Sequence, residues 1–301
     1  MIVNRETSTA KNTPKRSALK KHSFLLRCFL FALPSIAGLI TFYVFPYLRM
    51  LYMSMQKSSF SGEFAGLHHY IQLFKNELFR MSLLNAFRFA LVSTVLVVFI
   101  SLFVTLLLMR LPKRLQWFRH FFLFPILAPS VAMIMIWRTM FGDVELVNSL
   151  IAGIENGFKA MLPIYALFIW KNAGYCIILL LAAISRIPKT VVEAADLDGA
   201  TGFGRLRHIT IPLISPVLFF TAILMTLFSL RIFRESSLYY QTAFPPDAVY
   251  SVSYFINNHF NRLDYQRLSA ASVIFSLIVL VVVSVGYRFD RLFAKSSGGD
   301  E

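Results

Sequence analysis

The stretch from Pro188 to Pro216, PKTVVEAADLDGATGFGRLRHITIPLISP, is a polar island between two long apolar runs. Pro188 suits the first position of a helix, and Gly199 suits the left-handed residue that ends one. Thr201 can cap a second short helix, which should stop before Pro212 because proline has no backbone N–H. The stretch therefore predicts two short helices that meet at a bend.

The composition on both sides of this stretch places the chain in a lipid bilayer. Of its 301 residues 57% are hydrophobic and only 15% are charged, and the mean hydropathy is +0.63, which is too apolar for a soluble domain of this size. Six apolar runs are close to the roughly 20 residues that a helix needs to cross a bilayer: Phe24–Phe45, Phe87–Met109, Phe121–Phe141, Leu162–Ile184, Leu213–Ile232 and Leu268–Tyr287. We expect an all-α membrane protein with six transmembrane helices.

The net charge of +15 and the pI near 10.0 first suggest a nucleic-acid partner, but the distribution of the charge argues against one. The cations cluster before the first apolar run, between the second and third, after the fourth and after the last. With six spans all of these segments lie on one side, which is the positive-inside pattern. It predicts that both termini and the Pro188–Pro216 stretch are cytoplasmic.

The polar stretch also carries a family resemblance. It resembles the EAA loop of permease subunits in bacterial binding-protein-dependent type I ABC importers at Glu193-Ala194-Ala195, Asp198-Gly199-Ala200, Ile209, Pro212 and Pro216. In that family the loop seats in a groove of the ATPase subunit and transmits its closure to the membrane helices. The chain departs from the family at Leu206, where Phe is usual, and at Gly202 and Gly204.

The resemblance extends over nearly the whole chain. Leu33-Pro34, Phe45-Pro46 and Trp170-Lys171 look most like the carbohydrate-uptake branch, which includes maltose and glycerol-phosphate permeases. It implies a subunit of the bacterial cytoplasmic membrane that pairs with a second homologous permease, two ATPase subunits and an external or periplasmic solute-binding protein. It also implies that Glu193, Ala194, Ala195, Asp198, Gly199 and Ala200 couple the chain to the ATPase.

These observations divide the chain into segments. We expect a cytoplasmic basic tail at 1–23, a first transmembrane helix at 24–46 and an external segment at 47–84. A five-helix core at 85–289 should hold a cytoplasmic coupling loop at 186–212, and 290–301 should form a cytoplasmic tail. The amphipathic run that starts at Tyr70 suits a helix on the outer surface, a face beside the binding protein, or both.

The motifs for chemistry on substrates are missing from the sequence. It contains no Gly-x-x-x-x-Gly-Lys-Ser/Thr phosphate loop, so we expect partner subunits to bind ATP and this chain to be a transport subunit rather than an enzyme. The six histidines show no metal-ligand spacing, and we expect neither a metal nor another cofactor.

Charged groups within the apolar runs indicate a polar path, because a charge at the centre of a membrane helix is costly. Lys171 lies inside the fourth run, and Arg231, Arg234 and Glu235 lie near the outer end of the fifth. On one continuous helix Arg231 could pair with Glu235. Together with Asn172, Tyr239 and Tyr240 they are predicted to line a path for a sugar; in the alternative, Arg234 and Glu235 extend only to the outer interface.

Two questions remain open at the level of sequence. The excess positive charge also suits an acidic oligosaccharide, and a polyol is a further substrate class. The alternative mechanism is a secondary transporter driven by an ion gradient, which calls for carboxylates inside the membrane. Glu235 is the nearest candidate for such a group, and we find no internal repeat of the kind common in secondary transporters.

Overall fold

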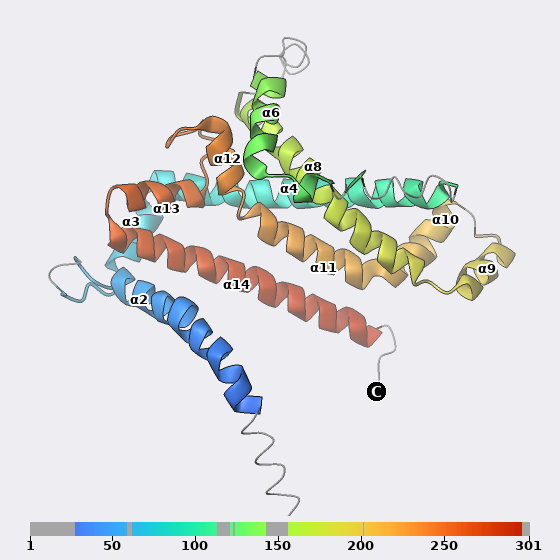
Figure 1. Ribbon diagram of the computed structural model, residues 1–301, viewed down its shortest axis with the longest axis horizontal. Coiled ribbons are helices and arrows are strands. Elements are labelled where there is room, and N and C mark those ends of the chain that lie inside the picture. Colours follow the sequence, from blue (N-terminus) through green and yellow to red (C-terminus); the bar gives the residue numbers. More distant parts are fainter. Residues whose placement is uncertain are drawn as a thin grey trace, which may run out of the picture. The chain divides into compact units, whose positions relative to one another are not determined.

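The computed structural model describes residues 28–58, 62–112, 121–122, 124–142, 156–200 and 202–296, the last of these with side chains up to 288. The chain divides into two compact units, Met1–Met53 and Ser54–Glu301, and each is described by itself. Figure 1 shows the helices of both units.

The first unit is a helix that runs from Cys28 into α2 (Phe45–Ser54). It continues past Pro34 and Pro46, and a π-helical turn, η1 (Ile40–Val44), precedes the second proline. A π turn is wider than an α turn, so it makes room where a proline ring would crowd the preceding carbonyls. The large apolar side chains of this first-unit helix are exposed, as in a helix that faces lipid.

The second unit begins with a bridge between Gln56 and Phe64, and its regular elements in the residues that the structure describes are all helices. Its elements are α3 (His68–Lys75), α4 (Glu77–Arg110), α5 (Phe124–Leu127), α6 (Ser130–Gly142), α8 (Asn156–Ser185), α9 (Lys189–Leu197), α10 (Phe203–Arg205), η3 (Leu206–Thr210), α11 (Ile211–Ser229), α12 (Phe233–Tyr240), α13 (Val252–Asn261) and α14 (Tyr265–Ser296). In this unit α3 and α13 lie at one end of the bundle and α9 lies at the other (Figure 1).

The centre of the second unit is α4, which packs against α8 and α11, while α14 packs against α11. The Asn76 side chain caps α4 by accepting the Phe79 N–H at 3.0 Å. Further along, Ser93 and Ser101 are fully buried. Their hydroxyls donate to backbone carbonyls, and small residues of this kind let membrane helices approach closely. Phe89 stacks on Tyr165 of α8 across this contact.

Five helices in the described residues are long and apolar enough to cross a membrane: Cys28–Ser54, Glu77–Arg110, Gly157–Ser185, Phe203–Ser229 and Tyr265–Arg288. The expected third span, Phe121–Phe141, is wrong as a single helix. The chain leaves the α conformation at 128–129, between α5 and the short apolar helix α6. A residue that precedes proline, here Ala128 before Pro129, is disfavoured in the α region. The all-α membrane fold is confirmed, and the count of six spans stays a prediction.

The expected end of a short helix before Pro212 is also wrong. α10, η3 and α11 form one helical segment, Phe203–Ser229, that passes through Pro212 and Pro216. The π turn η3 ends two residues before Pro212, just as η1 ends two residues before Pro46. The wider turn relieves the clash between the proline ring and the carbonyl four residues earlier, so the helix continues.

Candidate functional site

The first arm of the coupling loop (186–212) is α9, which begins after Pro188 and ends at a glycine. Pro188 is the extended N-cap, one position earlier than expected. Gly199 is left-handed, with φ +76°, as expected. The Ala200 N–H donates to the Ala195 carbonyl at 2.9 Å, and the Gly199 N–H donates to the Asp196 carbonyl at 3.2 Å. This pair of bonds is the Schellman motif, which closes the helix end and sets the bend.

The second arm begins at Gly202, whose φ of +55° suits glycine alone, and continues into α11. Thr201, the expected cap, lies outside the described residues. Arg205 joins the arms: its Nη1 lies 2.7 Å from Asp196 Oδ1. The two arms are therefore held together by a hydrogen-bonded turn and an ion pair.

The surface of this loop combines acidic and apolar groups. Glu193, Ala194, Asp198 and Gly199 are exposed, whereas Ala195 is buried and Ala200 is half-buried. Two large apolar side chains stand out in solvent: Leu197 is 90% exposed and Phe203 is 73% exposed. Exposed apolar groups on a rigid projection suit insertion into a groove of another protein. Sequence reasoning missed both residues, although Leu197 is the one large apolar residue between two aspartates.

A polar cavity of about 170 Å³ lies between α8 and the junction of α11 with α12. It is lined by Phe168, Lys171, Asn172, Phe228, Arg231, Ile232 and Glu235. The structure thus brings together four of the seven residues that were predicted for the path. Lys171 Nζ donates to Glu235 Oε1 at 2.5 Å and to Ser130 Oγ at 3.2 Å. The two charged side chains are only 21% and 12% exposed, so this ion pair is partly buried.

The expected pairing of Arg231 with Glu235 on one helix is wrong. Residues 230–232 form a turn between α11 and α12, in which the Arg231 N–H donates to the Phe228 carbonyl three residues earlier. This turn breaks the i, i+4 register on which the expectation rested. Glu235 pairs with Lys171 of α8 instead, and Arg231 is exposed, without an ion pair to any described residue.

The other three predicted path residues lie outside this cavity. Arg234 is exposed on α12. The Tyr240 hydroxyl donates to the Ala160 carbonyl of α8, and burial raises the pKa of this phenol. Burial also raises the pKa of Tyr239, and the positive charge of Arg138 partly offsets this shift. The two tyrosines therefore link α12 to its neighbours rather than line the cavity.

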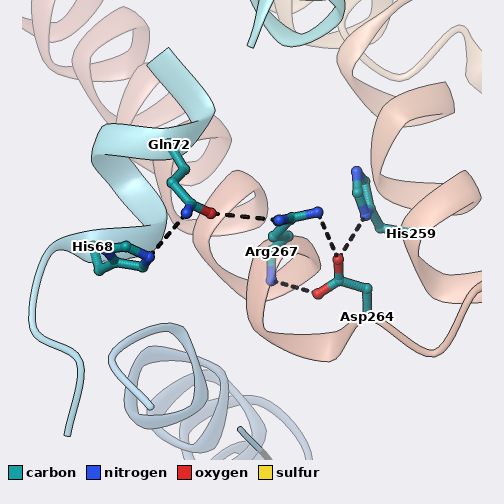
Figure 2. Close-up of polar contacts among 5 residues, drawn as sticks. All are labelled: His68, Gln72, His259, Asp264 and Arg267. Carbon is teal, nitrogen blue, oxygen red and sulfur yellow. Dashed lines mark hydrogen bonds and ion pairs between the residues drawn. The ribbon is translucent and has the colours of Figure 1, made fainter. Parts of the chain in front are cut away.

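The opposite end of the bundle carries a second polar cluster, which joins α3 to the α13–α14 corner (Figure 2). Asp264 lies 3.3 Å from His259 Nδ1 and 3.5 Å from Arg267 Nη1, both measured to Oδ2. Arg267 Nη2 donates to Gln72 Oε1 at 3.5 Å, and Gln72 Nε2 lies 2.9 Å from His68 Nε2. Burial lowers the pKa of His259, and Asp264 partly opposes this shift. Within the described residues no cluster of His, Cys, Asp or Glu could hold a metal ion.

Membrane-length helices, a partly buried charged cavity and a rigid projecting loop together define a membrane transport protein. The chain belongs to the family described as binding-protein-dependent transport system inner membrane components, whose model matches residues 98–297. It is a multi-pass protein of the bacterial inner membrane.

Similar proteins support the same class. The lactose transport system permease protein LacF of Rhizobium radiobacter is 28% identical over 90% of this chain and 95% of its own length. The trehalose/maltose transport system permease protein MalF of Thermococcus litoralis is 30% identical over 87% of this chain and 94% of its own. The resemblance to the carbohydrate-uptake permeases is confirmed.

A solved structure shares the fold. It is a bacterial ABC transporter involved in the import of the acidic polysaccharide alginate, and it matches with a TM-score of 0.76 at 20% identity. The match covers 92% of this chain and 98% of that one.

Proposed function

We propose that the chain is the membrane-spanning permease subunit of an ATP-driven importer of sugars, with oligosaccharides as the substrate class, and that it couples to ATPase subunits through the coupling loop. The rigid, solvent-exposed loop on the family's Glu193-Ala194-Ala195 pattern is the observation that carries this proposal. The partners are a second homologous permease, two ATPase subunits and an external solute-binding protein. The α3–α13–α14 corner, at the end of the bundle opposite α9, is the face we assign to the binding protein.

The loop is built to transmit motion. Its second arm continues into α11 as one helical segment, and α9 follows α8 after only three residues, 186–188. When ATP closes the ATPase dimer, a groove that holds Leu197 and Phe203 carries the loop with it. Because the turn at Gly199 and the Asp196–Arg205 pair stiffen the loop, its displacement reaches α8 and α11 directly.

The charged cavity supplies the recognition chemistry. Lys171, Arg231 and the Asn172 amide offer donors, Glu235 offers acceptors, and Phe168 and Phe228 offer aromatic walls for the apolar faces of a sugar ring. The cavity in this chain forms one wall of the path, and the second permease completes it. With two cations and one carboxylate the wall also admits an acidic oligosaccharide, and a polyol presents the same hydroxyls.

The coupling role is tested by co-purification with the ATPase subunits. Glu193→Lys and Leu197→Asp should each reduce the ATPase that is retained at least fivefold, while membrane insertion stays intact. Leu67→Asp is the matched control, because Leu67 is 63% exposed on the α3 side of the bundle. Unchanged ATPase retention and unchanged transport in both coupling-loop variants would remove the role assigned to the loop.

The cavity is tested by sugar uptake in cells in which complex assembly has been verified. Arg231→Ala and Lys171→Ala should each reduce uptake, whereas Arg234→Ala, outside the cavity, should have little effect. Full transport in both cavity variants would discard the lining role. Uptake that survives ATP depletion but stops when ion gradients collapse would instead favour a secondary transporter.

A further inference from the structure

A groove beside the coupling loop is lined by cations that have no role in the proposed sugar path or in the proposed contact with the ATPase. It lies between the end of α4, the end of α8 and both arms of the loop, and its volume is about 600 Å³. Its cations are Arg110, Lys189 and Arg205, and no acidic residue is among the described residues that line it. Arg205 is paired with Asp196. Arg110 and Lys189 are exposed and form no ion pair with any described residue.

Apart from Ser185 and Thr210, the other side chains that line the groove are apolar. They include Leu106 and Met109 of α4, Ile184 of α8 and Ile187 of the connection that follows α8. Met109 is 44% exposed, so the groove offers hydrocarbon contact beside its two unpaired cations. An anion with an attached apolar chain matches this combination better than a free inorganic anion does.

The groove also lies at the level where two spans end. The membrane-length helices end at Arg110 and at Ser185, and both residues line it. Lipid headgroups occupy this level in a bilayer, and basic pockets between helices on the cytoplasmic side bind anionic headgroups. The excess of cations on this side predicts that it is cytoplasmic.

We propose that the groove binds one anionic phospholipid of the inner leaflet, with its phosphate between Arg110 and Lys189 and an acyl chain along Leu106 and Met109. The inference rests on the proposed function in one respect, since it takes the coupling loop as cytoplasmic. A lipid in this position bridges α4 and α9, so it links membrane composition to the placement of the loop.

The test measures lipid retention by the purified full-length chain with native mass spectrometry, using phosphatidylglycerol and phosphatidylcholine with the same acyl chains. At about 1 kcal/mol for each cation, the wild-type chain should prefer phosphatidylglycerol by about 30-fold. Arg110→Gln/Lys189→Gln should lose this preference. The matched control is Arg186→Gln/Arg207→Gln, which removes two exposed cations of the same loop that do not line the groove and should keep the preference.

Three results would overturn the proposal. The first is no preference for phosphatidylglycerol in the wild-type chain, and the second is an equal loss of that preference in both double variants. The third is a loss of ATPase co-purification in Arg110→Gln/Lys189→Gln with the lipid preference intact, which would make the groove a protein contact. Labelling of Ala194→Cys by an impermeant maleimide, in a background without Cys28, separates this inference from the proposed function. Labelling from outside the cell defeats the proposed function, whereas protection without a lipid preference defeats the lipid site alone.

Discussion

Neutralising Glu235 should destabilise the protein by leaving Lys171 without a counter-charge. The two charges are 2.5 Å apart, and within the described residues Lys171 Nζ donates one other hydrogen bond, to Ser130 Oγ. In Glu235→Gln the ammonium stays partly buried and loses its counter-charge. Removing one partner of a buried ion pair costs about 3–5 kcal/mol. Because the Lys171 side chain keeps 21% of its exposure, we expect the low end, about 3 kcal/mol.

This loss is measurable as a shift in thermal unfolding of the detergent-solubilised protein. About 3 kcal/mol corresponds to a decrease in Tm of roughly 5 °C for a chain of 301 residues, because the unfolding entropy is about 2.1 cal/mol/K per residue. The double variant Lys171→Met/Glu235→Gln should recover most of the decrease, because it leaves no unpaired charge. The control is Glu63→Gln: Glu63 pairs with Lys57 at 3.0 Å, but the two side chains are 61% and 70% exposed, so the loss should stay below about 1 kcal/mol.

Unfolding of Glu235→Gln at the wild-type temperature would contradict this prediction. A double variant as unstable as the single one would contradict it too, because the cost would then not come from an unpaired charge.

Three further predictions concern helix packing, the coupling loop and the α3–α13–α14 corner. Gly286→Val should destabilise the α11–α14 contact by about 1–3 kcal/mol, since a Cβ would lie 2.3 Å from Ile223 Cδ1; adding Ile223→Ala should restore part of the Tm, and an unaffected Tm would contradict the close approach. Gly199→Val should cost about 1–2 kcal/mol through its φ of +76° and reduce ATPase retention, while Gly204→Ala, with a negative φ, should do neither. For His259, whose folded pKa lies below 6.5, stability is fully present above pH 6.5 and is lost as the pH falls towards the folded pKa, because the unfolded state takes up the proton first. When the pH is lowered to 5.5, the protection of α13 from hydrogen exchange should therefore fall more in the wild-type chain than in His259→Gln, and an equal change in protection in the two proteins would refute the linkage.

Sequence reasoning predicted well where the cause of a structure is local. The apolar runs predicted the long helices because a span needs only length and hydrophobicity. Gly199 was predicted as a left-handed helix end because that conformation depends on the residue itself. It failed at Pro212, where a local rule that ends helices was overridden by a π turn that accommodates the ring. The prediction of one continuous span failed at 128–129, where the sequence stays apolar but the helix is interrupted.

The sequence by itself determined the membrane class and the family and predicted a coupling loop, because composition, charge bias and the Glu193–Ala200 pattern are all read along the chain. Only the tertiary structure decided which charges meet. Lys171 and Glu235 are 64 residues apart, and the basic groove draws on α4, α8 and both arms of the loop. Side chains on different helices become neighbours only when the packing of those helices is set, and that packing depends on contacts along their whole length.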